Sequence, residues 1–395
     1  DKIRFRQGYP EKIGGWTPIN ITSYVGDVSS IIQYGTTDSN EIISIATDEK
    51  NYVLIGTELT DITPLRITYI TSTTPSTDNC FKTTDESTTV TVTLTGHGGS
   101  DGDYVTFSGS AAVGGVIAAN LNTEFKISNV ANNTFDITVA AAATSTVAAG
   151  GGTSIVAAFQ YPVGSSTITF GYGWSAGTWN RSTWGSSAST PVVIPARLTF
   201  QDKFNNDVIY NIQDSDIFYW EYDSGLSNRA VKLNTLVNSR AVPEQVGKVM
   251  FAASGHLLAL SCTSYGRSTT AGQSISSITR SGTTATVTTG SGHNLSVYDW
   301  VDFTGQAPSA YQGEFQVVTV PSSTTFTYTL PYDPGASASP AGTYVEVTYS
   351  GTLDPMLIRF ANVDATIGPE PEEWKPELTN SAGFIRVKQG SQIIT

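Results

Sequence analysis

The chain has 395 residues, with 34 acidic and 21 basic side chains and a formal net charge of −13. This charge has the wrong sign for wrapping nucleic acid, because binding to phosphates relies on lysine and arginine. No apolar run of about 18 residues occurs, so no membrane span is expected. Two distant cysteines, Cys80 and Cys262, are too few for a disulfide framework or a four-ligand zinc site. Threonine, serine, glycine, valine and tyrosine dominate, which predicts an all-β protein.

The N-terminal stretch IRFRQGYPEKIGGWTPI (3–19) contains the only dense basic group of the chain. Arg4, Arg6 and Lys12 could dock onto an acidic neighbour in an assembly, or they could form the solvated face of a strand. Trp16 follows them and is a candidate for packing or for a subunit contact. The sequence is compatible with both interpretations of the basic group.

Short strand-like runs, several of them ending at Gly, Asn or Asp, are spread over residues 1–85, 158–275 and 349–395. They are SSIIQY, EIISIAT, NYVLIGT, VIYNIQ, IFYWEY, KVMFAA, HLLALSC and PMLIRFA. Short strands at regular spacing with hairpin-like turns are typical of a β-propeller or a sandwich. We therefore expect a propeller-like host domain of short antiparallel strands in three parts, the last of them truncated. SNRAVKLNTLVNSRA (227–241) is the one weak helix candidate, and it is equally plausible as a loop.

Two segments of the chain, 86–157 and 276–348, are copies of one another. In each copy a histidine precedes an aspartate by six positions, and a Glu-Phe pair follows at 124–125 or 314–315. Each copy contains strand-like runs separated by turn residues, as in a small β-sandwich or barrel. Two copies this far apart cannot stack as a solenoid. The sequence therefore predicts two β-modules inserted into loops of the host, here called module A and module B.

The paired histidines and aspartates of the modules are His97 with Asp103 and His293 with Asp299. Equivalent placement in both copies favours a hydrogen bond that fixes a turn over a metal or acid–base role, which would need further partners. The segment SDGD (100–103) lacks the full spacing of an EF-hand calcium loop. We expect no metal and no cofactor.

The segment GYGWSAGTWNRSTWG (171–185) places Trp174, Trp179 and Trp184 five residues apart. This spacing matches neither the helical nor the strand period, so the rings cannot share one face of one element. Packing or a subunit contact is one interpretation. Stacking on sugars is the other, since indole faces suit the apolar faces of sugars.

Near the C-terminus, GPEPEEWKPE (368–377) clusters four carboxylates that could mimic a catalytic pair: Glu370, Glu372, Glu373 and Glu377. The interleaved prolines predict an extended, solvated loop instead. A nucleophile elbow and nucleotide-binding glycine patterns are missing from the sequence. We therefore expect that the chain is not an enzyme.

Several of these stretches together resemble the tail nozzle, or tubular tail protein, family of short-tailed (podovirus-type) bacteriophages. They are the N-terminal stretch 3–19, DITPLRIT (61–68), the tryptophan segment 171–185 and the C-terminal stretch 354–395. The two modules also look like inserts that are common in phage virion proteins. Family members normally carry residues before Asp1 and a long β region after Thr395, so both ends of the chain look cut.

The resemblance implies a structural virion protein of the phage tail, assembled in the host cytoplasm. Six copies would form a ring that continues the DNA channel below the portal and the tail adaptor ring, retains the genome and lets it exit during ejection. Tail fibres or spikes would attach at the side, and double-stranded DNA would pass an acidic wall without specific binding. The alternative is a receptor- or glycan-binding tail protein that uses the tryptophan segment and the modules.

Overall fold

The structure is a computed structural model that describes residues 3–6, 9–12, 23–71, 75–162, 198–251, 255–363 and 373–387. The described residues form an all-β protein, as the composition predicts. They contain 29 strands, one four-residue helix, α1 (Ala118–Leu121), and two 3-10 turns, η1 (Leu233–Thr235) and η2 (Ser309–Tyr311). Near the N-terminus, β1 (Ile3–Arg6) and β2 (Tyr9–Lys12) form an antiparallel hairpin.

The host part contains three four-stranded antiparallel sheets. The first consists of β3 (Val28–Gly35), β4 (Glu41–Thr47), β5 (Asn51–Ile55) and β6 (Glu58–Asp61). The second consists of β15 (Thr199–Phe204), β16 (Asp207–Ile212), β17 (Ile217–Trp220) and β18 (Val231–Lys232). The third consists of β19 (Val246–Phe251), β20 (Leu257–Thr263), β28 (Leu353–Phe360) and β29 (Gly383–Arg386).

In each host sheet the strands lie side by side in chain order, as in the four-stranded blades of a propeller. All eight strand-like runs expected in the host form strands of these sheets. The residues that the structure describes form three such sheets and do not close a ring of blades. The helix candidate 227–241 contains β18 and the short turn η1 instead of a helix.

The two central strands of the second sheet, β16 and β17, are buried on both faces, which suits their largely apolar sequences. Alternate residues of β16 point to opposite sides: Val208 and Tyr210 pack against the first sheet, and Ile209 packs toward the third. The buried Asn211 side chain joins the second and third sheets. Its Nδ2 donates to the carbonyl of Val246 at 2.7 Å, and its Oδ1 accepts a further backbone hydrogen bond from β19.

Module A is a sandwich of two four-stranded sheets around one core. One sheet consists of β11 (Glu124–Lys126), β10 (Tyr104–Ser108), β14 (Val156–Gln160) and β7 (Leu65–Tyr69). The other consists of β12 (Thr134–Thr138), β9 (Thr89–Thr93), β8 (Phe81–Thr83) and β13 (Val147–Gly150). Because β7 and β8 precede residue 86, the strands of the module span 65–160, and the expected 86–157 was too short.

Module B closes its strands into a six-stranded barrel, with β21 added at one edge. Its strands are β21 (Arg267–Thr269), β22 (Gln273–Ser281), β23 (Thr284–Thr289), β24 (Trp300–Thr304), β25 (Gly313–Ser322), β26 (Thr325–Thr329) and β27 (Thr343–Tyr349). The pairing of β27 with β24 closes the barrel. The module starts at residue 267, earlier than the expected 276, since β21 and the beginning of β22 carry no repeat signal.

The polypeptide enters and leaves module B through a two-stranded neck. The pairing of β20 with β28 runs up to Thr263 opposite Leu353, and β21 with β27 resumes the ladder nearby. Two glycines let the two backbones approach here. A Cβ on Gly266 would lie 2.1 Å from the Ser350 carbonyl oxygen, and a Cβ on Gly351 would meet a backbone oxygen equally closely.

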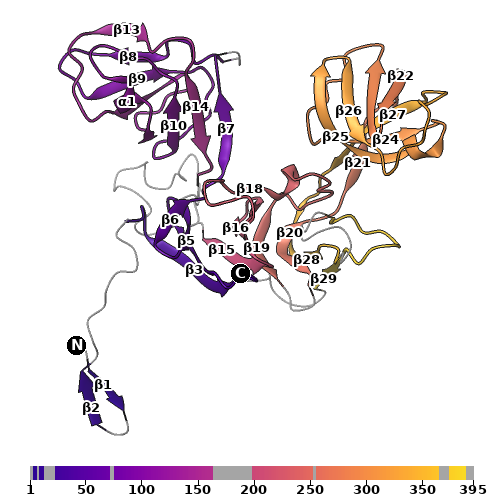
Figure 1. The fold of residues 1–395 in the computed structure, drawn as a ribbon, viewed down its shortest axis with the longest axis horizontal. Helices are drawn as coiled ribbons and strands as arrows, with labels where there is room; N and C mark the ends of the chain where they lie inside the picture. Colours follow the sequence, from indigo (N-terminus) through magenta and orange to yellow (C-terminus); the bar gives the residue numbers. More distant parts are fainter. Residues whose placement is uncertain are drawn as a thin grey trace, which may run out of the picture.

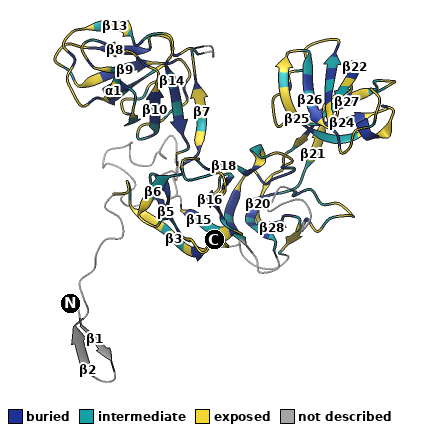
Figure 2. Ribbon diagram, viewed as in Figure 1, coloured by how far each residue is buried: buried dark blue, intermediate teal, exposed yellow. Residues whose placement is uncertain are grey.

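In the view of Figure 1 both modules lie above the three host sheets. Buried residues fill the interior of each module and the spaces between host sheets (Figure 2). Each module therefore has its own core and meets the host through a limited junction. No helix among the described residues has the length and apolar character needed to cross a membrane.

Candidate functional site

His97 of module A holds a turn through both of its ring nitrogens. Its Nδ1 accepts the N–H of Gly99 at 3.1 Å, and its Nε2 lies 2.9 Å from the carbonyl oxygen of Ala131. Because Nδ1 must accept, the hydrogen bonds assign the neutral tautomer with the proton on Nε2. The ring is 1% exposed and packs edge-on against Phe135.

His293 of module B repeats this arrangement. Its Nδ1 accepts the N–H of Leu295 at 3.0 Å, its Nε2 donates to the carbonyl of Ser322 at 3.0 Å, and its ring packs edge-on against Phe326. These are the contacts that a turn-fixing histidine requires. They leave neither ring nitrogen free for a metal.

The aspartates that follow the histidines close the same turns. Oδ2 of Asp103 accepts the N–H of Ser100 at 2.9 Å, and Oδ2 of Asp299 accepts the N–H of Ser296 at 2.7 Å. Among the residues that the structure describes, no group of three or more His, Cys, Asp or Glu could hold a metal ion.

Module A docks onto the host through an aromatic ring and a glutamate. Lys50, in the turn between β4 and β5, lies 4.7 Å from the centroid of the Tyr104 ring and forms an ion pair with Glu124. The same ammonium lies 2.9 Å from Asp61, which also faces Arg229 at 3.4 Å. Burial disfavours the charge of Lys50, but these carboxylates outweigh it and raise the pKa of the lysine.

Module B uses the equivalent pair of residues. Trp300 follows the turn aspartate just as Tyr104 does, and the Arg240 guanidinium lies 5.5 Å from its ring centroid. Glu314 occupies the position of Glu124 in the repeat, and its Oε2 forms an ion pair with the Arg240 guanidinium at 3.2 Å. Arg267 and Lys375 each reach the same carboxylate at 2.8 Å.

A third repeated position also touches the host in both modules. Lys126, two residues after Glu124, pairs with Glu49 at 2.8 Å. Gln316, two residues after Glu314, accepts the N–H of Asn238 at 2.8 Å through its Oε1. The two modules therefore dock through the same face of their shared fold.

Glu314 is the most strongly perturbed of these carboxylates. Burial alone would raise its pKa, but hydrogen bonds from Lys375, Tyr349 and Arg267 outweigh burial and hold the pKa at about 2. Its side chain is only 8% exposed. The carboxylate is therefore ionised at neutral pH and joins the module, the neck and the C-terminal segment.

Two of the C-terminal glutamates belong to this junction, and the expectation of a solvated loop is wrong for residues 373–376, which are buried or half-buried, whereas Glu377 is exposed. Glu373 pairs with Arg240 at 2.6 Å, and Glu377 lies 2.9 Å from Lys375. Between them, Trp374 is fully buried in the host core. Tertiary contacts override the polar local composition here. Glu370 and Glu372 lie outside the described residues.

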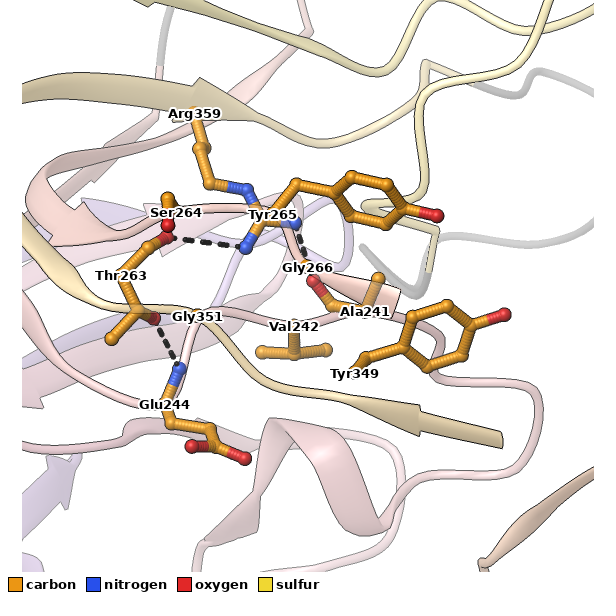
Figure 3. Close-up of a pocket in the computed structure, with 10 residues that line it drawn as sticks. All are labelled: Ala241, Val242, Glu244, Thr263, Ser264, Tyr265, Gly266, Tyr349, Gly351 and Arg359. Atoms are coloured by element: carbon orange, nitrogen blue, oxygen red, sulfur yellow. Dashed lines mark hydrogen bonds between the residues drawn. The ribbon is translucent and has the colours of Figure 1, made fainter. Parts of the chain in front are cut away.

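Next to the junction, Arg359 is a buried cation held by backbone carbonyls. Figure 3 shows it above the lining residues of a small pocket, with the rings of Tyr265 and Tyr349 at one side. The guanidinium donates to the carbonyls of Ala241 at 2.6 Å, Trp374 at 3.0 Å and Thr263 at 3.4 Å. Burial lowers the pKa of Arg359 to about 10, so it remains charged at neutral pH.

Some residues singled out from the sequence cannot be placed. Trp16, Trp174, Trp179 and Trp184 lie outside the described residues. Arg4, Arg6 and Lys12 belong to the β1–β2 hairpin, where Arg4 is opposite Glu11 and Lys12 is opposite Ile3, but their side chains are not described.

Both cysteines are free, buried thiols, and burial raises the pKa of Cys80 to about 12 and that of Cys262 to about 11. A thiol with a raised pKa is a poor nucleophile. The cysteines therefore serve as small core residues.

Among known proteins, the chain has similarity only at the level of solved structures. No protein-family pattern and no curated protein matches the chain. Among solved structures, the chain is similar to one titled Phage phi92 endosialidase, with 12% sequence identity and a TM-score of 0.20 over 98% of this chain. The chain spans 61% of the length of that structure.

Proposed function

We propose that the chain is a structural virion protein, a subunit of the tail nozzle of a short-tailed phage. In this role it forms a ring below the portal and the adaptor, retains the genome and lets it exit during ejection. The sequence stretches described above resemble that family. The observation in the structure that supports the role best is the repeated docking of two modules, through one common face, onto blade-like sheets.

This architecture suits a scaffold better than a catalyst. The strongest charges near the junctions neutralise one another across module–host contacts, with Glu314 bound by three cations. Such networks fix the direction in which a module projects. Outward modules on a fixed host could meet tail fibres or spikes, while the host strands build the wall of the ring.

The distribution of cations supports a wall over which DNA slides. Many lysines and arginines of the described residues are already committed to carboxylates of the same chain; these are Lys50, Lys126, Arg229, Lys232, Arg240, Arg267, Arg280, Lys375 and Arg386. A paired cation has little attraction left for phosphate. With the net charge of −13, little remains to hold a duplex.

Cryo-electron microscopy of the phage particle that carries this chain tests the proposal. We expect copies of the chain around the tail axis, below the adaptor, in a ring with an open bore and with six copies. The modules should lie on the outside of the ring. Copies found only in off-axis fibres or spikes, or a bore lined by lysine and arginine, would overturn it.

A further inference from the structure

A cavity of about 240 Å³ opens between module B and the host, beside the ionic junction. Module B contributes Tyr298, Trp300 and Glu346 to its wall, and the host contributes Asn234 and Glu244. Ligand pockets for drug-sized molecules hold roughly 300–1,000 Å³. This cavity is therefore matched to one ring-sized group, with the rest of a longer ligand in solvent.

Tyr298, on the wall of the cavity, has a strained backbone. Its φ is +76°, in the left-handed region that bulky residues avoid. The equivalent residue of module A is Gly102, with φ +94°, and each of the two donates its N–H to an equivalent carbonyl at 2.9 Å. The turn thus requires a left-handed residue, and module A meets the requirement with glycine at no strain.

Packing does not account for the tyrosine in module B. The residue is 43% exposed, so a large part of it does not pack against the core. Backbone strain of this kind concentrates at functional sites, where a side chain is kept for what it contacts. An exposed aromatic ring held in place by a rigid turn is a ready stacking surface.

Two carboxylates on the same wall are available as hydrogen-bond acceptors. Within the described residues, the side chains of Glu244 and Glu346 form neither an ion pair nor a hydrogen bond. Glu314, nearby, is by contrast fully engaged by its cations. The third carboxylate of the wall, Asp299, uses one oxygen to hold its own turn.

We propose that this cavity binds a neutral saccharide. The apolar face of a pyranose ring stacks on Tyr298, and its hydroxyl groups donate to Glu244 and Glu346. The uncommitted carboxylates repel sialic acids, uronic acids and phosphate esters, which selects for uncharged sugars. This inference does not depend on the nozzle role, because a single chain suffices to show it.

Saturation-transfer NMR with the full chain tests the inference directly. The neutral probes are maltotriose, cellotriose and chitotriose, and 3′-sialyllactose is the anionic probe. We expect at least one neutral probe to bind and the anionic probe to give no signal. Absence of binding for all three neutral probes, or preferential binding of sialyllactose, would overturn the proposal.

The Tyr298→Gly variant separates binding from folding. It installs the residue that module A already has at this turn, so the backbone strain disappears and the melting temperature should stay equal or rise. Binding of the neutral sugar should weaken by at least about tenfold. Glu346→Gln should also weaken binding without loss of fold.

The matched control is Tyr332→Ala, since Tyr332 is another exposed tyrosine of module B, 57% accessible, that does not line the cavity. This variant should bind like the parent. Sugar binding that survives Tyr298→Gly would place the binding elsewhere on the chain, and the inference would be wrong.

Discussion

At the scale of single residues, Arg359 shows how a buried charge can be held without a carboxylate. Its guanidinium donates to three carbonyls that come from three separate segments, and the side chain is 2% exposed. Replacing it with methionine keeps the bulk but leaves buried carbonyls without donors.

We expect Arg359→Met to lower the free energy of unfolding by about 2–4 kcal/mol. Arg386→Met is the control, because the Arg386 side chain is 59% exposed and, among the described residues, forms an ion pair with Asp354 alone. That variant should change stability by less than about 0.5 kcal/mol. Denaturant unfolding followed by tryptophan fluorescence measures both, and equal effects would show that Arg359 does not hold the segments together.

The turn-fixing role of the histidines can be tested with two substitutions of different severity. Asparagine at position 97 can present Oδ1 where His97 presents Nδ1, so it keeps the acceptor for Gly99 and loses only the contact with Ala131. We therefore expect His97→Ala to destabilise module A more than His97→Asn, with a difference of about 1 kcal/mol. Thermal unfolding of the two variants measures this, and the same order is expected at the more exposed His293. A reversed order would exclude a turn-fixing role.

At the scale of elements, the docking of module B should depend on pH through Glu314. The pKa of this carboxyl is lowered from 4.5 to about 2 in the folded chain. A lowered pKa stabilises docking at pH values above the ordinary one, and the stabilisation is lost as the pH falls from about 4.5 toward 2. The shift corresponds to an order of 3 kcal/mol.

The amide of Asn238 reports this docking, since it donates to Gln316 of the module across the junction. The protection of this amide against hydrogen exchange, corrected for the slower intrinsic exchange in acid, should fall in acid for the parent chain and be low at all pH values for Glu314→Gln. Glu124→Gln, the equivalent change in module A, should leave the exchange of this amide unchanged. Identical pH profiles for the parent and Glu314→Gln would show that this carboxylate does not control docking.

The neck of module B makes a deletion possible. Residues 266–350 leave and re-enter the host between two paired strands, so an Asn-Gly turn can close the hairpin of β20 and β28. We expect the shortened chain to fold, with its third sheet intact. Circular dichroism and the hydrogen exchange of β20 amides measure this, and an unfolded product would mean that the module is needed to fold the host.

The sequence predicts the elements better than their connections. Eight of the twelve strands in the host sheets follow from short apolar runs, and the modules follow from their repeat. The ends of the modules were missed because β7 and β21 join their sheets by pairing with distant strands, without any repeat signal. The docking glutamates were visible as repeated Glu-Phe pairs, but their partners Lys50 and Arg240 come from unrelated host segments, which no local pattern connects.

Trp374 shows the same limit. Proline and glutamate surround it, so its neighbours in sequence indicate solvent. Its burial comes from packing in the host core, and its N–H donates to the carbonyl of Arg240 at 2.9 Å across more than a hundred residues of chain. The saccharide cavity was likewise out of reach, because its walls come from two domains.

At the scale of the whole molecule, the chain should not adhere to DNA. We expect no retardation of a duplex oligonucleotide in gel electrophoresis at low salt, where electrostatic attraction is strongest. Retardation of the duplex that weakens with added salt would reveal a basic surface. It would argue against a wall over which DNA slides. A lysine-rich protein of similar size serves as the positive control.

The shared docking face has an evolutionary and a practical consequence. Each module has an aromatic ring, a glutamate and a polar side chain at fixed positions of its fold. It therefore keeps its side of the docking contacts when it is inserted into another protein. The recipient protein has to supply a cation that contacts the aromatic ring and the glutamate of the module. It also has to supply two neighbouring strands to which the two ends of the module connect. Such a unit can be gained, lost or exchanged between proteins while the recipient keeps its topology.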